Sequence, residues 1–211
     1  MIAPAVVGRR VHLVGPLSAA PTPFEEIYAL DDPSWARQAF DTARLLQRAA
    51  TSGSGVDLDD IARYAAHQPG WGVAARYMPL LSQERDRAGD MIERVQNALL
   101  AYLGLPLSER MREQFNATIA YAFVNLAAQR NAPWLVFARE ADGCARYRYS
   151  LLFALHAAAG GSSLCLAPVV LDVRVDRDVE RARLVTVKDE IGCSVRIDAL
   201  KLFLPRPRAG E

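Results

Sequence analysis

The residue types that commonly catalyse reactions are present in this chain, but their spacing matches no active-site pattern. The two stretches rich in glycine and serine, Gly53 to Gly55 and Gly160 to Ser163, both lack the G-x-S-x-G spacing of a nucleophile elbow. The acidic pairs that begin at Asp31 and Asp59 stand at expected helix starts, where the helix dipole accounts for them. Glycine-rich phosphate loops are absent as well. We therefore expect no catalytic residues and no enzymatic activity.

Histidine and cysteine are too dispersed to predict a metal site or another cofactor. His156 lies beside an apolar run, so we expect a hydrogen-bonded core histidine rather than a ligand. The three cysteines, Cys144, Cys165 and Cys193, form no CxxC pattern and no Cys/His cluster. A disulfide between the second and third is conceivable if their strands are neighbours, but buried thiols are the favoured state.

The charge of the chain argues against nucleic acid as a partner. With 25 basic and 24 acidic residues the formal net charge is +1, so no basic footprint for nucleic acid is present. All basic residues except Lys188 and Lys201 are arginines, whose planar guanidinium groups suit phosphates, including those of lipid headgroups. A GC-rich genome that often encodes arginine and alanine explains the same bias, so the bias alone decides nothing.

No stretch approaches the ~20 apolar residues of a transmembrane helix. The short apolar run from Val11 to Val14, after two arginines, is too short for the apolar core of a secretory signal. We therefore expect a protein that is soluble as made, without a recognisable signal peptide. Any contact with a membrane must be amphipathic or made by strands.

The part of the chain from about residue 31 to residue 129 has the patterns of helices. Asp32 and Pro33 favour a helix start, as cap and first helical residue. Gly104 and Pro106 force a turn between two longer apolar patterns, which predicts an antiparallel helical hairpin. A strand is expected before this part, at Val6 to Val14. The expected helices are Pro33 to about Ala49, Asp57 to His67, a short one near Val73 to Leu81, Asp90 to Leu103, and Ser108 to Gln129.

The last third of the chain, about residues 131–204, predicts about five successive strands. From Arg146 to His156 the odd positions are all apolar or aromatic, whereas the even positions are polar as far as Ser150 and apolar afterwards. Leu164 to Val175 shows the mirrored pattern. The glycines and serine between the two strands predict a hairpin, which brings the doubly apolar ends together. Further strand segments are expected at Val185 to Val187 and from Cys193 to Phe203.

A sheet that is apolar on both faces needs cover on both faces. Because four or five helices precede these strands, the economical architecture is a single α/β domain that spans residues 1–211. We expect a three-layer α-β-α sandwich, with a largely antiparallel sheet wrapped by helical hairpins.

The order of these elements and the wording of several segments resemble the cytolytic delta-endotoxins, the Cyt toxins of bacterial parasporal crystals. The resemblance is most specific from about Asn125 to Phe203, and upstream it is mainly one of element order. The segments that carry it are Asn125-Leu126, Trp134 to Phe137 with Glu140, Tyr147 to Leu155, Gly160-Gly161, Pro168, and Val185 to Asp189.

The resemblance implies a cytolysin that binds phospholipid bilayers without a protein receptor and permeabilises them as a homo-oligomer, by pore formation or by detergent-like disruption. It would act outside the producing cell, on target membranes. The alternative from a different class is a non-lytic lipid or fatty-acid binding protein, which would hold an acyl chain between the helix layer and the sheet. The resemblance makes the strands from Arg146 to His156 and from Leu164 to Val175 the inserting elements. Their expected insertion and lipid-binding residues are Tyr147, Tyr149, Leu151, Phe153, Leu155, Leu164, Leu166, Val169, Leu171 and Val173. Trp134 and Phe137 are further candidates, either as an aromatic anchor at the membrane interface or as core residues.

Members of the family are commonly protoxins with terminal extensions that proteolysis removes. This chain begins almost at its first expected strand and ends soon after Phe203. We therefore expect either no such processing or the removal of only the strand from Val6 to Val14.

Overall fold

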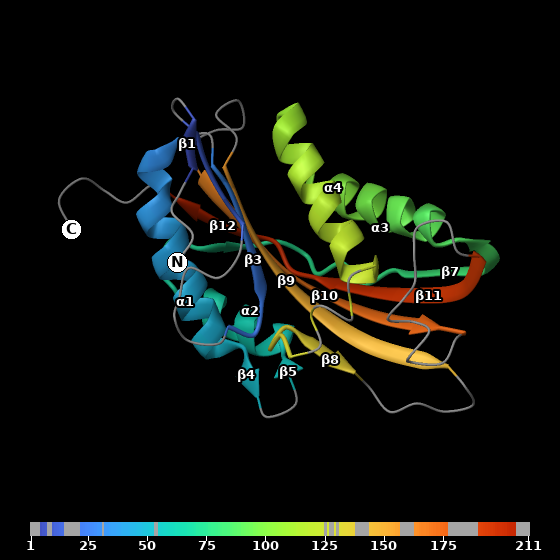
Figure 1. The fold of residues 1–211 in the computed structure, drawn as a ribbon. Helices are drawn as coiled ribbons and strands as arrows, with labels where there is room; N and C mark the ends of the chain where they lie inside the picture. Colours follow the sequence, from blue (N-terminus) through green and yellow to red (C-terminus); the bar gives the residue numbers. More distant parts are fainter. Residues whose placement is uncertain are drawn as a thin grey trace.

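The computed structural model describes residues 5–7, 10–14, 22–30, 32–52, 55–124, 126, 129, 131–137, 144–156, 163–176 and 190–205. A large sheet lies at its centre, and helices pack on both of its faces (Figure 1). This arrangement confirms the predicted three-layer α-β-α sandwich.

The central sheet has ten strands in the described part of the chain. Its order is β1-β2-β3-β9-β10-β11-β7, while β12 pairs with β10 and β6, and β8 pairs with β9. The pairings are antiparallel except for the parallel pair of β3 and β9, so the sheet is largely antiparallel as predicted. The strands are β1 (Ala5–Val7), β2 (Arg10–Val14), β3 (Glu25–Leu30), β6 (Gly72–Val73), β7 (Leu80–Arg87), β8 (Leu135–Phe137), β9 (Ala145–His156), β10 (Ser163–Val175), β11 (Glu190–Ala199) and β12 (Leu202–Pro205).

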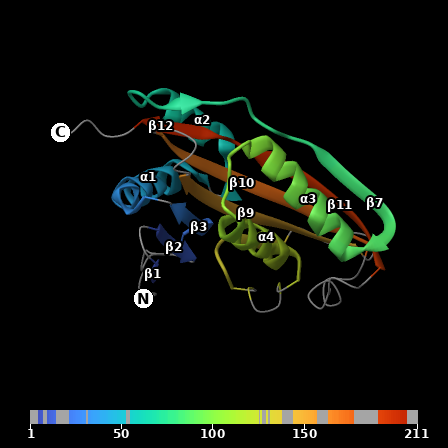
Figure 2. The same cartoon turned by 90° about the horizontal axis from the view of Figure 1, so that it is seen from above.

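The helices form two layers that cover different parts of the sheet. Helices α3 (Ala88–Leu103) and α4 (Glu109–Val124) lie over one face, across β9, β10 and β11 (Figures 1 and 2). Helices α1 (Ala36–Ala49) and α2 (Leu58–Ala66) lie against the other face. There they form a second core cluster with the C-terminal half of β9 and the N-terminal half of β10. A separate two-stranded ribbon, β4 (Thr51–Ser52) with β5 (Gly55–Val56), connects α1 to α2.

The ends of these helices follow local sequence signals. The Asp32 side chain accepts a hydrogen bond of 2.9 Å from the Ser34 amide, at a short 3-10 turn (Pro33–Trp35) that leads into α1. Asp57 caps α2 in the same way, accepting bonds from the amides of Asp59 and Asp60 at 2.8 and 3.4 Å. Gly104 ends α3 with a φ of 58°, a left-handed conformation that glycine adopts without steric cost. The predicted starts of α1 and α2 and the turn after α3 are therefore confirmed.

The helix predicted near Val73 to Leu81 is wrong. The chain forms the short strand β6 there and then the longer edge strand β7, which pairs with β11. Along β7 the side chain of Leu81 packs against the core while that of Leu80 is exposed, which is the alternation of a strand. The apolar pattern between the flanking glycines and prolines is too short to distinguish the period of a helix from that of a strand.

The strands before α1 also differ from the prediction. Val6 to Val14 is not one strand but the hairpin of β1 and β2. The next strand, β3, was not predicted, although all six of its residues are buried. Its first two residues are glutamates, and charged residues are rarely buried without partners, so the segment did not read as an inner strand.

The remaining elements agree with the prediction to within a few residues. The helix expected to reach Gln129 ends at Val124, and the strand expected from Cys193 to Phe203 is interrupted at Leu200, giving β11 and β12. The segment Val185 to Val187 and the hairpin tip between β9 and β10 lie outside the described residues. The two strands do pair as an antiparallel hairpin.

Two open points about single side chains are settled. Cys165 and Cys193 are buried free thiols and form no disulfide. Cys165 lies near the start of β10, whereas Cys193 lies on β11 opposite Val175, the last residue of β10. His156 is a buried core residue that stacks on Trp35 with ring centroids 4.8 Å apart. The expected hydrogen bond of His156 is not found at Nδ1, which has no partner among the described residues.

Candidate membrane-inserting strands

The candidate functional strands, β9 and β10, form the longest ladder of the sheet. They contain 12 and 13 residues and pair in continuous register from Cys165 opposite Leu155 to Val175 opposite Ala145. A strand that crosses the apolar part of a bilayer needs ~9 to 11 residues. Both strands therefore have sufficient length, and their backbone groups already satisfy one another.

Most of the predicted insertion residues lie on the face that α3 and α4 cover. These side chains are at most 1% exposed and belong to one core cluster with the apolar sides of both helices. Phe153 packs against Phe115 of α4 with ring centroids 4.7 Å apart. The predicted residues on this face are Tyr147, Tyr149, Leu151, Phe153, Leu155, Val169, Leu171 and Val173.

Leu164 and Leu166 lie on the opposite face. They belong to the second core cluster, with Leu152 and Ala154 of β9 and the buried sides of α1 and α2. The structure thus divides the predicted residues between the two faces of the sheet. Exposing all of them requires the removal of both helix layers.

Trp134 and Phe137 lie at the edge of the same sheet, at and just before β8. Both side chains are half-buried. The indole Nε1 of Trp134 donates a hydrogen bond of 3.2 Å to Oε1 of Gln129, and the ring of Phe137 lies 6.2 Å from that of Tyr147. In this conformation they support β9 from the side rather than project from the molecule.

A buried carboxylate touches β9 beneath α4, and its only signal in the sequence is the pair of glutamates that starts β3. The Tyr149 hydroxyl is in hydrogen-bond contact with Oε2 of Glu25 and with Oε1 of Gln129. Burial raises the pKa of Glu25, and the hydrogen bond from Tyr149 opposes that shift.

The neighbouring Glu26 faces the opposite helix layer. It is only 2% exposed and accepts hydrogen bonds from the Tyr28 hydroxyl at 3.0 Å and from Nε2 of Gln47 on α1. Strand β3 therefore places one buried carboxylate under each helix layer, next to β9.

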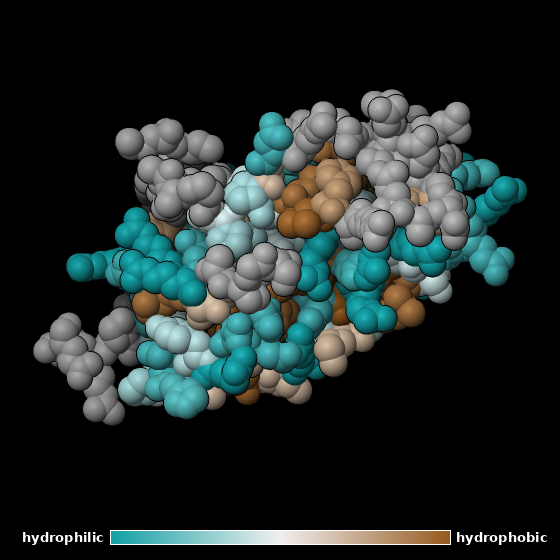
Figure 3. Space-filling view, turned by 90° about the horizontal axis from the view of Figure 1, so that it is seen from below, coloured by the Kyte–Doolittle hydropathy of each residue, from teal (hydrophilic) through white to brown (hydrophobic). Residues whose placement is uncertain are grey.

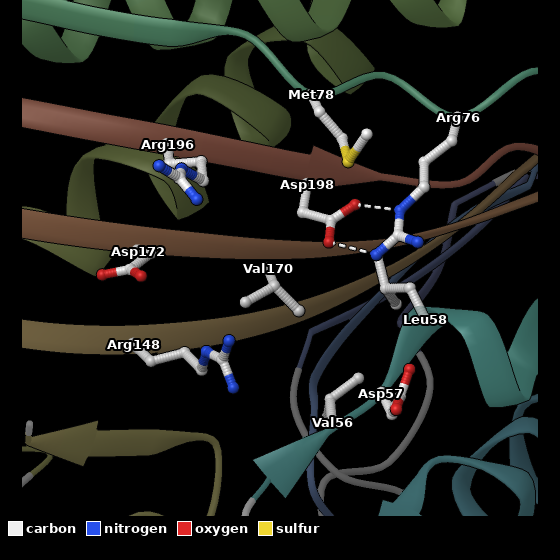
Figure 4. Close-up of a pocket in the computed structure, with 10 residues that line it drawn as sticks. All are labelled: Val56, Asp57, Leu58, Arg76, Met78, Arg148, Val170, Asp172, Arg196 and Asp198. Carbon is white, nitrogen blue, oxygen red and sulfur yellow. Dashed lines mark hydrogen bonds and ion pairs between the residues drawn. The ribbon is translucent and has the colours of Figure 1, made fainter.

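The outer halves of β9, β10 and β11 are polar on the face that turns away from α3 and α4. Arg148, Asp172 and Arg196 stand opposite one another on the three strands (Figure 4). Arg146 binds Asp172 through two hydrogen bonds of 2.9 and 2.6 Å, and these bonds are the main reason why the pKa of Asp172 is lowered. The alternation predicted for the outer half of β9 is confirmed, with apolar residues toward the helices and arginines away from them.

A cleft of about 290 Å³ separates these polar strand ends from the start of α2 (Figure 4). Arg76 closes one side by binding Asp198 through hydrogen bonds of 2.6 and 2.5 Å, and it also pairs with Asp59. Within the described ranges, no three His, Cys, Asp or Glu side chains gather in a way that could hold a metal ion. None of the helices described here is long and apolar enough to cross a membrane.

The geometry defines a protein whose longest apolar strands are enclosed by two helix layers. The family model described as Bacillus thuringiensis toxin matches residues 3–205. Among curated proteins, the chain is 27% identical over 189 residues to the Type-1Aa cytolytic delta-endotoxin of Bacillus thuringiensis subsp. morrisoni, covering 85% of this chain and 75% of the relative. It is 26% identical over 189 residues to the Type-1Ba cytolytic delta-endotoxin of subsp. neoleoensis, covering 85% of this chain and 71% of the relative.

Solved structures show the same fold. The activated Cyt2Ba monomer from Bacillus thuringiensis subsp. israelensis superposes with a TM-score of 0.81 at 21% identity, covering 88% of this chain and all 100% of that one. A structure named delta-endotoxin gives a TM-score of 0.83 at 19% identity, covering 100% of this chain and 94% of that one. The chain belongs to the family of cytolytic delta-endotoxins, as the resemblance of its sequence segments predicted.

Proposed function

We propose that this protein is a cytolysin that binds phospholipid bilayers directly and permeabilises them by inserting β9 and β10. The observation that carries the proposal is the pair of long strands whose apolar side chains are almost completely enclosed by helices. In water the helices shield this surface, whereas a bilayer can receive it once they move away. Membership of the cytolytic delta-endotoxin family supports the same function.

Insertion must be coupled to self-association. Within a bilayer no water is present to satisfy the backbone groups at a sheet edge, and each unsatisfied group costs several kcal/mol. Inserted strands from several copies satisfy these groups by pairing with one another, which makes a homo-oligomer the active form. A protein receptor is not needed, because phospholipid alone provides both the headgroup surface and the apolar phase.

Leakage from vesicles of pure phosphatidylcholine tests the proposal. The chain offers a way to fix α3 to the sheet, because the rings of Tyr77 and Tyr102 stack with centroids 4.8 Å apart. The variant Tyr77→Cys/Tyr102→Cys, bridged by a short thiol-reactive linker, should release no dye, and cleaving a reducible linker should restore release. Tyr64→Cys/Trp71→Cys is the matched control, since it joins α2 to the turn that follows it. All variants carry Cys144→Ser to remove the half-exposed thiol.

The outcomes separate the possible functions. Release of small dyes but not of large dextrans indicates a pore of defined size, whereas release of both at once indicates detergent-like disruption. Full release by the bridged protein would refute the requirement that α3 and α4 separate from the sheet. No release by the unmodified chain at saturating concentration, together with a co-purifying lipid, would replace the cytolysin by a non-lytic lipid or fatty-acid binding protein.

A further inference from the structure

One part of the sheet surface carries arginines without an equal number of carboxylates. Four exposed arginines project from the outer halves of three adjacent strands, on the face opposite α3 and α4. We name this surface the arginine face, and it consists of Arg146, Arg148, Asp172, Arg174 and Arg196. Figure 3 views the molecule from this side, where hydrophilic residues prevail and apolar groups are exposed between them.

The pairing of charges on the arginine face leaves positive charge in excess. Asp172 lies opposite both Arg148 and Arg196, but its carboxylate accepts two hydrogen bonds from the guanidinium group of Arg146. In the residues that the structure describes, Arg148 and Arg196 make no hydrogen bond or ion pair of their own and interact with Asp172 only through its field. At the margin of the face, Asp176 accepts a bond of 2.9 Å from the Gly192 amide.

Arg174 adds a positive charge to the arginine face that no carboxylate of the described residues binds. Arg174 stands directly opposite Arg146 in the ladder, and like charges in that position repel each other. The contact recorded for the Arg174 guanidinium is the Cys144 sulfur at 3.8 Å, which does not neutralise it. The arrangement is suited to an external partner that supplies negative charge.

Apolar side chains border the arginine face on both sides. Of the four large hydrophobic residues described as exposed, three lie along this surface: Met78 and Leu80, each 62% exposed, and Val136, 46% exposed. Val136 stands opposite Arg148, and Leu80 stands opposite Arg196. Met78 lines the cleft beside Arg196 (Figure 4). A row across five strands therefore has an apolar residue at each end, with Arg148, Asp172 and Arg196 between them.

We propose that the arginine face is the surface on which the intact soluble protein first docks on a phospholipid bilayer. The inference rests on the proposed cytolytic function and adds which surface meets the membrane. Guanidinium groups bind phosphate oxygens bidentately, and the lipid phosphates form the charged layer that these arginines complement. The bordering Met78, Leu80 and Val136 enter the headgroup region, as exposed apolar groups at membrane surfaces do.

This orientation places β9, β10 and β11 parallel to the membrane with α3 and α4 on the far side (Figure 1). The helical hairpin can then separate into water without crossing lipid. The apolar face of the strands is then uncovered only on molecules that are already docked on the membrane.

Paired charge-removal variants test the docking surface. Arg148→Gln/Arg196→Gln removes two charges from the arginine face, and Arg110→Gln/Arg112→Gln removes two exposed charges from α4 on the other side of the sheet. Binding to vesicles of phosphatidylcholine mixed with phosphatidylglycerol is measured by co-sedimentation at low salt. An arginine close to an anionic membrane strengthens binding about five-fold, so the first variant, which loses two arginines, should bind about 25-fold more weakly. The α4 variant should retain the affinity of the unmodified chain.

A second pair of variants uses the apolar border and does not depend on the arginines. Leu80→Asp should weaken binding, whereas Val73→Asp, at a residue 42% exposed on β6, should not. Unfolding midpoints like that of the unmodified chain establish that each variant is folded.

Equal affinities for the two arginine variants would overturn the inference. Dye release by the unmodified chain on the same vesicles keeps the two proposals distinguishable. Release with binding that is insensitive to Arg148 and Arg196 would refute only the docking surface. If the unmodified chain shows no binding and no release, this result would refute the cytolytic function and, with it, the docking surface.

Discussion

The contact between Phe115 and Phe153 gives a quantitative test of whether α4 must leave the sheet. Phe115 is 1% exposed, and its ring packs against the ring of Phe153 on β9. Replacing a buried phenylalanine by alanine typically costs about 3 to 5 kcal/mol. For a chain of this length each kcal/mol lowers Tm by about 2 to 4 °C, so Phe115→Ala should lower Tm by roughly 6 to 20 °C.

The same variant should accelerate dye release. We assume that about half of the lost packing energy comes from contacts that break before the transition state for separation of α4 from the sheet. The barrier to that separation then falls by about 2 kcal/mol, which corresponds to roughly a 30-fold higher rate. The assay is the initial rate of release from phosphatidylcholine vesicles, at a temperature where the variant is still folded by circular dichroism.

Leu46→Ala is the matched control. Leu46 is fully buried, but it lies on α1 in the other helix layer. Its loss should lower Tm by a comparable amount, but the initial release rate should change little if separation of α4, and not of the layer that contains α1, is the limiting step. Equal acceleration by both variants would show that release follows global stability, and an unchanged rate for Phe115→Ala would refute separation of α4 as the limiting step.

Two further predictions concern pH and backbone packing. Burial raises the pKa of Glu25, so its contribution to the closed form is fully present below the unfolded pKa and is lost as pH rises through the folded pKa. Release should therefore become faster as pH rises above the ordinary pKa of a glutamate. Glu25→Gln, neutral throughout, should flatten this dependence in the same vesicle assay. The groups that face Glu25 are Tyr149 and Gln129, with Gln114, Thr118 and Tyr121 from α4, and a pH profile that Glu25→Gln leaves unchanged would exclude this carboxyl. Gly192→Ala should destabilise the sheet by about 1 to 3 kcal/mol in urea unfolding, because the added Cβ would lie 2.5 Å from Oδ2 of Asp176 and 2.8 Å from the carbonyl of Glu84; Gly72→Ala, where the nearest atom is 3.6 Å away, should cost less.

The sequence predicted the parts of the fold in which local pattern and burial agree. The alternation along β9 and β10, the caps at Asp32 and Asp57, and the glycine that ends α3 each depend on a few neighbouring residues. These signals were sufficient to predict three layers and the central hairpin. They also identified which side chains of β9 would be enclosed.

The parts that the sequence did not predict depend on contacts between distant residues. The inner position of β3 results from partners for its glutamates that lie elsewhere in the chain, Tyr149 for Glu25 and Gln47 for Glu26. Strand β7 is defined by its pairing with β11 rather than by its own apolar period. The arginine face combines residues from three strands, so its excess of charge is evident only when the register is known.

The two short strands beside β9 have a consequence for association between copies. One edge of β9 pairs with β10, and the other edge is covered by β3 along Leu151 to His156 and by β8 along Tyr147 to Tyr149. An uncovered strand edge is a template for pairing with another chain. Each of these small strands thus protects part of the β9 edge. Detachment of either one would leave that part of β9 with unpaired backbone groups, available to pair with another strand. We therefore expect the backbone hydrogen bonds of β3 and β8 to β9 to determine whether this edge can pair with a second copy.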